Sequence, residues 1–152
     1  MHTYQDTQQS SYSTQQLFDL VINIERYPEF LPWCRAARII ERGDERLLAE
    51  LLITFKHITE SYTSEVLFRR PTTVSDDGTI EVNLVQGPFE HLSNHWKFAP
   101  LPAGGSEISL ELSFKFRSRI LDSVIGLLFG KASAKMVLAF KQRADRLYGG
   151  KC

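Results

Sequence analysis

The sequence is poor in cysteine and has no excess of charge of either sign. Of its 152 residues, only Cys34 and Cys152 are cysteines. Two cysteines so far apart do not make the disulfide framework of a small secreted protein, which favours a reducing compartment. Lys and Arg number 18, as do Asp and Glu, so the formal net charge is zero. A protein that holds nucleic acid by its overall charge is strongly basic, so we expect no DNA binding.

Long apolar runs and secretion signals are missing as well. The strongest apolar run is Leu121–Phe129, which is interrupted by Asp122. A membrane-spanning helix needs about 20 apolar residues, so we expect none here. The polar N-terminus has no basic segment followed by an apolar one, so we expect no signal peptide. No repeat or linker divides the chain, and we expect a single domain over residues 1–152.

The first third of the chain carries helix signals. Ser13 and Gln16 have the spacing of a capping box at a helix start. An apolar stripe with helical spacing follows, formed by Leu17, Leu20, Val21 and Ile24. Pro28 fits the first turn of a second short helix, and Pro32 ends the segment. Before these helices, residues 2–10 have a weak strand pattern.

The middle of the chain alternates between apolar and polar residues, and the end does not. Alternation is visible in residues 47–55, 58–68, 80–84, 92–98 and 108–116, which predicts antiparallel strands with one dry face. From about Ile120 to Tyr148 the apolar residues follow helical spacing, and Gly149-Gly150 ends this long helix. We therefore predict an α+β fold: a strand, two short helices, about six antiparallel strands, and a long helix that covers the dry face.

Residues for catalysis or metal binding are not grouped in any familiar motif. The chain has no G-x-S-x-G, no glycine-rich phosphate loop and no Cys-x-x-Cys. His91 and His95 would stand about 13 Å apart on a strand, too far to share a metal ion. We expect no metal and no catalytic residue, and Cys34 is interpreted as structural because no base stands near it.

Two polar residues fall on the otherwise apolar side of predicted strands. Glu60 is either a buried carboxylate with a raised pKa or an exposed residue at the start of its strand. Asn94 either hydrogen-bonds a ligand or satisfies a neighbouring backbone group. Both alternatives stay open for each residue.

The dry faces are rich in aromatic residues. They include Phe55, Tyr62, Phe68, Phe89, Trp96, Phe98, Phe114 and Phe116. This pattern indicates either a large packed core or a cavity for an apolar ligand between the sheet and the terminal helix. The segment Tyr27–Cys34, with sequence YPEFLPWC, is equally apolar and either folds over the core or forms a lid or a membrane-touching patch.

Taken in order, several fragments resemble the coenzyme Q-binding START-domain family. This family belongs to the polyketide cyclase/dehydrase and lipid transport superfamily and includes the ribosome association toxin RatA. The resemblance covers about Tyr4 to Gly149. It is carried by Tyr12-Ser13, Leu17-Phe18-Asp19-Leu20-Val21, Tyr27–Cys34, Tyr62-Thr63-Ser64, Gly87-Pro88-Phe89, Leu92, Trp96-x-Phe98, Phe114-x-Phe116-x-Ser118 and Ala139-Phe140-x-x-Arg143-Ala144-x-x-Leu147-Tyr148-Gly149.

The resemblance implies a helix-grip fold of the START and Bet v1 type, with a curved antiparallel sheet around the C-terminal helix and an apolar tunnel between them. It implies carriage of a polyprenyl lipid, most simply ubiquinone, in support of respiration or ubiquinone biosynthesis, without catalysis and without a cofactor. The mouth would be formed by Phe30, Leu31 and Trp33. The walls would be lined by Phe55, Tyr62, Phe89, Trp96, Phe114 and Phe116 from the sheet, and by Val124, Leu128 and Met136 from the helix.

Two other functions stay open. The RatA branch suggests binding to the large ribosomal subunit. The basic residues for such a contact would be Arg117, Arg119, Lys131, Lys135, Lys141, Arg143 and Arg146. An oligoketide cyclase or dehydratase would need an acid or base in the tunnel, and Glu60 is the best candidate. Because the chain begins almost at its first strand, without room for a transit peptide, we expect a bacterial cytoplasmic protein, with transient contact to the inner membrane surface as an alternative.

Overall fold

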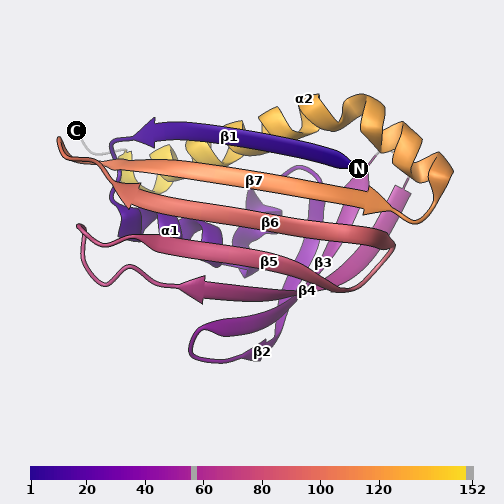
Figure 1. Cartoon of the computed structure of the whole chain (residues 1–152), viewed down its shortest axis with the longest axis horizontal. Coiled ribbons are helices and arrows are strands. Elements are labelled where there is room, and N and C mark those ends of the chain that lie inside the picture. The colour runs from indigo at the N-terminus through magenta and orange to yellow at the C-terminus, as the bar shows by residue number, and fades with distance from the viewer. Residues whose placement is uncertain (56–57, 150–152) are drawn as a thin grey trace.

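The computed structural model describes residues 1–55 and 58–149. Its elements follow one another in a simple order, and Figure 1 shows the sheet as long arrows with one long helix beside them. The chain runs through β1 (His2–Ser10), α1 (Thr14–Ile22), η1 (Ile24–Glu29), β2 (Cys34–Arg42), β3 (Arg46–Phe55), β4 (Ile58–Arg69), β5 (Gly78–Gln86), β6 (Phe89–Pro100), β7 (Ser106–Phe116), α2 (Arg119–Ala144) and η2 (Asp145–Gly149).

The seven strands form one antiparallel sheet in the order β1-β7-β6-β5-β4-β3-β2. β5, β6, β7 and β1 run almost side by side in Figure 1, whereas β2, β3 and β4 turn away from them, so the sheet is strongly curved. The sheet and the long C-terminal helix confirm the predicted α+β helix-grip fold. Strand β2 has no clear alternation because it lies at the sheet edge, carries two register shifts and is mostly exposed.

The predicted start of α1 is confirmed by its hydrogen bonds. The Gln16 backbone N–H donates to Ser13 Oγ (3.1 Å), and the Ser13 N–H donates to Gln16 Oε1 (3.0 Å). The second short helix, however, does not begin at Pro28. It is a 3₁₀ helix, η1, that contains Pro28 near its end, because a turn is closed earlier when the Arg26 N–H donates to the Asn23 carbonyl.

The C-terminal helix begins at Ser118, whose Oγ accepts from the Leu121 N–H. It runs through α2 and continues as a wider π turn, η2, to Gly149. The sequence alone predicts no membrane-spanning helix, because the run Leu121–Phe129 is too short. By length and composition, however, the helix over residues 119–149 could cross a membrane. Met136, Phe140 and Ala144 nevertheless pack into the protein core, so the helix is part of the folded domain.

Two helices, α1 and α2, cover the concave face of the sheet. The sequence had suggested that the long C-terminal helix covers this face alone. α1 inserts Phe18, which is fully buried and contacts the rings of Phe68 and Phe98. The main core lies below α1 and the second half of α2. A smaller aromatic cluster lies below the first half of α2 and is built around Phe89, Leu92, Phe114 and Phe116.

Candidate ligand-binding site

An inner compartment of about 50 Å³ lies between the curved sheet, η1 and α2. Its walls come from α1, from η1 and the segment after it, from β3 to β6 and from α2. Five of the side chains predicted to line a ligand tunnel lie here: Leu31, Trp33, Tyr62, Trp96 and Met136. They come together because the inward positions of neighbouring antiparallel strands share one face, and α2 closes that face.

Asn94 brings an amide group to the wall of the inner compartment. Its side chain lies on the same face as Trp96, and its Oδ1 is buried without a hydrogen-bond donor among the described residues. Buried polar atoms are nearly always paired, so an orphaned amide oxygen at a cavity wall is a candidate ligand contact. Ser64, also buried, is a second polar residue of this wall.

The two tyrosines of the inner compartment are held neutral. Burial raises the pKa of both Tyr27 and Tyr62 well above the usual value for a phenol. The Tyr27 hydroxyl donates to the Val21 carbonyl, which ties η1 to α1. Burial also raises the pKa of the nearby Cys34 thiol to about 11. Cys34 is therefore a buried free thiol, as expected for a cysteine with a structural role.

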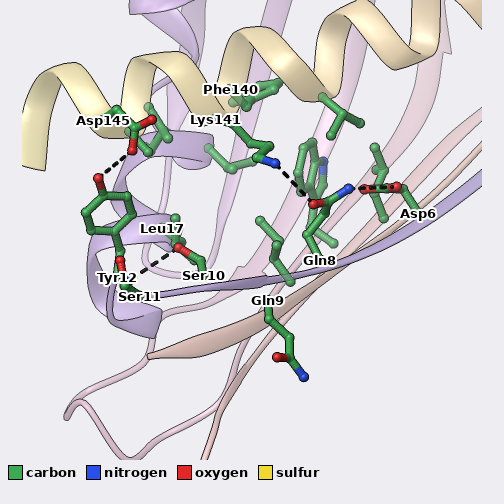
Figure 2. A pocket seen from close by; sticks show the side chains of 17 residues that line it. Asp6, Gln8, Gln9, Ser10, Ser11, Tyr12, Leu17, Phe140, Lys141 and Asp145 are labelled. Carbon is green, nitrogen blue, oxygen red and sulfur yellow. Dashed lines mark hydrogen bonds between the residues drawn. The ribbon is translucent and has the colours of Figure 1, made fainter. Parts of the chain in front are cut away.

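A larger outer compartment, of about 220 Å³, lies between β1, α1 and the second half of α2. Figure 2 shows β1 on one side, α2 on the other and the labelled polar side chains along the rim. At this rim Lys141 Nζ donates to Gln8 Oε1 (3.4 Å), and Gln8 Nε2 donates to Asp6 Oδ1 (3.2 Å). The Tyr12 hydroxyl donates to Asp145 Oδ1 (2.5 Å). The interior is apolar and is formed by Leu17, Leu20, Val21, Trp96, Ile108, Leu110, Val137, Phe140 and Ala144.

Three side chains separate the two compartments. Val21, Trp96 and Phe140 line both of them. The Trp96 and Phe140 rings meet edge to face, with centroids 5.2 Å apart, and Phe140 also contacts Tyr27 and Phe30. The side chains that the two compartments share are therefore one valine and two aromatic rings.

The other described side chains that were predicted to line the tunnel do not line either compartment. Phe30 packs between Phe140 and the Arg143 guanidinium, which stands 5.1 Å from its ring centroid, so it closes a corner rather than lining an opening. Phe89, Phe114 and Phe116 form the smaller cluster, in which Phe89 stacks on Phe116 at 4.5 Å.

On the helix side, Val124 is exposed and Leu128 is half-buried, and neither lines a compartment. The side chain of Phe55 lies outside the described residues. The sequence alone does not predict the opening between β1 and α2. Phe140 could have indicated it, because Phe140 follows the predicted tunnel residue Met136 by one helical turn on the same face.

The remaining polar candidates do not form a reactive site. Glu60 shares the inner face of β4 and is half-buried, but it lines neither compartment. His91 Nε2 lies 2.7 Å from Ser113 Oγ, and His95 Nε2 lies 3.4 Å from Glu81. Among residues 1–55 and 58–149, no three His, Cys, Asp or Glu side chains gather as metal ligands.

A curved sheet gripping a terminal helix, with an apolar cavity between them, defines the helix-grip class. Within it, the chain belongs to the family described as "Polyketide cyclase / dehydrase and lipid transport", whose sequence profile matches residues 10–141. That description joins enzymes with lipid carriers, so membership alone assigns neither activity.

Individual relatives carry different names. The chain is 42% identical over 149 residues to the "Ribosome association toxin RatA" of Rickettsia prowazekii, covering 97% of this chain and 99% of the relative. It is 27% identical to the mitochondrial "Coenzyme Q-binding protein COQ10 homolog B" of Xenopus laevis, covering 96% of this chain and 59% of that protein. The Zhui aromatase/cyclase of Streptomyces sp. R1128 has the same fold, with a TM-score of 0.81, 15% identity and 99% coverage of both chains.

Proposed function

We propose that this protein binds a polyprenyl lipid of the ubiquinone class in the two compartments and carries it without catalysing a reaction. The observation that supports this best is the shared aromatic wall. Because Val21, Trp96 and Phe140 line both compartments, a rearrangement of these side chains would join the compartments into one tunnel. The coenzyme Q-binding relative supports the choice of ligand class.

The size of the site suggests how such a ligand would be held. The outer compartment, at about 220 Å³, is somewhat smaller than ligand pockets of about 300–1,000 Å³, so a long tail does not fit inside. Each buried CH₂ of a tail contributes about 0.8 kcal/mol, so the first isoprene units are enough for tight binding. The rest of the tail would leave between β1 and α2.

The polar end of the ligand would point inward. Asn94 Oδ1 and the Ser64 hydroxyl lie at the wall of the inner compartment, away from the rim with Gln8 and Lys141. A hydroxyl of a reduced, ubiquinol-type head group would donate to Asn94 Oδ1, and the Ser64 hydroxyl would donate to a carbonyl or methoxy oxygen of the ring. In this orientation Asn94 Oδ1 favours the reduced, hydroxyl-bearing form of the head group.

The direct test is lipid extraction of the purified full-length protein followed by mass spectrometry, and then titration with a short-chain ubiquinone. We expect a bound polyprenyl lipid and saturable uptake of the probe. Val137→Trp fills the outer compartment and should weaken uptake at least ten-fold, whereas Gln142→Trp, exposed on the same helix, should not. A protein that holds no prenyl lipid and takes up no probe would contradict the proposal.

Ribosome association is the second candidate, and the 42% identical relative named RatA is the observation that favours it. Six of the seven basic residues singled out in the sequence are exposed. Arg143 is not available for RNA, because its guanidinium lies 2.7 Å from Glu29 and its side chain is only 12% exposed. Association with bacterial ribosomes would place the protein in the cytoplasm.

Co-sedimentation of the protein with the large ribosomal subunit over a salt series tests this second candidate. Binding through phosphates should weaken steeply as salt rises. Lys131→Glu and Lys135→Glu together should abolish it, whereas Lys97→Glu, an exposed lysine on β6, should have little effect. No co-sedimentation at low salt would exclude this function.

A further inference from the structure

The outward side of α2 exposes a stripe of large apolar side chains. We define the outer stripe as Ile120, Val124, Leu127 and Leu138, which follow one another at helical spacing on one face. Ile120 is 80% exposed and Leu127 is 88% exposed. In the most apolar 18-residue stretch of the helix, only 17% of the residues are buried. Exposed apolar patches of this kind mark interaction sites on folded proteins.

Charge around the stripe is of one sign. Residues 117–144 contain one acidic residue, Asp122, among Arg117, Arg119, Lys131, Lys135, Lys141 and Arg143, although the whole chain has zero net charge. Asp122 faces inward, where Oδ1 accepts from the Phe116 N–H (2.9 Å) and lies 3.0 Å from His2 Nε2. Arg119, Lys131 and Lys135 are exposed and form no ion pair within the part of the chain that the structure describes.

We propose that this face of α2 docks on the surface of an anionic phospholipid membrane. The outer stripe enters the boundary between headgroups and acyl chains, while Arg119, Lys131 and Lys135 contact lipid phosphates. The helix lies in the membrane plane and does not cross it, because its other side holds Met136, Phe140 and Ala144 in the core. The proposal is independent of any ligand in the compartments.

Lipid fits this surface better than its alternatives do. RNA phosphates would pair with the lysines but would leave Ile120 and Leu127 in water. A second copy of the chain could bury those two residues, but a symmetric contact would bring Lys131 and Lys135 against the same basic face of the partner. An anionic membrane accepts both the apolar and the basic side chains.

The test is sedimentation of the full-length protein with lipid vesicles at low and at physiological salt. The probes are vesicles of phosphatidylcholine with phosphatidylglycerol and vesicles of phosphatidylcholine alone. We expect binding to the anionic vesicles only, at least ten-fold weaker for Ile120→Ser/Leu127→Ser. Lys131→Glu should weaken it several-fold, since each basic residue near such a surface contributes about a five-fold gain. Val74→Ser/Val85→Ser, exposed apolar residues outside α2, is the matched control and should bind like the wild type.

Three results would overturn the proposal. The first is absence of binding to anionic vesicles at low salt, and the second is equal binding by the stripe variant and the control. The third is loss of dimerisation or of ribosome co-sedimentation in the stripe variant while vesicle binding is unchanged, which would assign the face to a second copy or to RNA. Circular dichroism of each variant checks that the fold is intact.

Discussion

The two halves of α2 have opposite relations to the rest of the protein. The second half buries Ser133, Met136, Phe140 and Ala144 against the sheet and α1. The first half has no fully buried residue, and only its inner side, with Leu121, Ile125 and Phe129, packs against the smaller aromatic cluster. One helix is therefore a core element at one end and a surface element at the other.

Polar contacts follow the same division. The second half of α2 and the turn after it have four polar contacts: Arg143 to Glu29, Lys141 to Gln8, Tyr148 to the Gln16 carbonyl, and Tyr12 to Asp145. The first half is fixed mainly through Asp122, which contacts Phe116 and His2. The two compartments therefore lie under the half with more polar contacts, while the first half leaves its outward apolar side chains free for another surface.

The largest expected effect separates the two halves by stability. Phe140→Ala removes a ring that is 7% exposed and should lower the free energy of unfolding by about 3–5 kcal/mol. Leu127→Ala removes a side chain that is 88% exposed and should change it by less than about 0.5 kcal/mol. Urea denaturation followed by circular dichroism measures both. Equal losses for the two variants would mean that the first half is not a surface element.

Asn94→Leu should sharpen the difference on the cavity side. Removing a buried polar atom without a partner should raise the free energy of unfolding by about 1–2 kcal/mol. The same change should weaken uptake of a short-chain ubiquinol, because its hydroxyl loses the acceptor Asn94 Oδ1. Asn83→Leu on β5, where the amide donates to Glu81, is the control and should leave uptake unchanged. A less stable Asn94→Leu protein would show that Asn94 has an essential partner in the unliganded fold.

The sequence patterns predicted most of the helices and strands but not the position of the site. Alternation and helical spacing predict five strands, α1 and α2, because each pattern follows from burying one face. They do not predict β2, whose edge position leaves it mostly exposed, nor η1, whose first turn closes at Asn23 before the proline is reached. Parity places both Tyr62 and Phe114 on the dry face, yet only Tyr62 reaches the inner compartment. Alternation along a strand predicts which face of the sheet a side chain lies on, but not where along the curved sheet it lies.

The smallest expected effect concerns the anchor of the first half and depends on pH. The Phe116 N–H, together with His2, holds the pKa of Asp122 below its usual value of 3.8. A carboxyl group whose pKa is lower in the folded state stabilises that state fully above its unfolded pKa, and this contribution is lost as the pH falls through the lowered value. Asp122→Asn should therefore flatten the acid side of the stability curve below about pH 4. Urea denaturation between pH 2 and pH 6 measures this slope, with Asp44→Asn in the β2–β3 turn as the control. An unchanged slope in Asp122→Asn would mean that Asp122 does not anchor α2 through its charge, and the first half would then be held by Leu121, Ile125 and Phe129 alone.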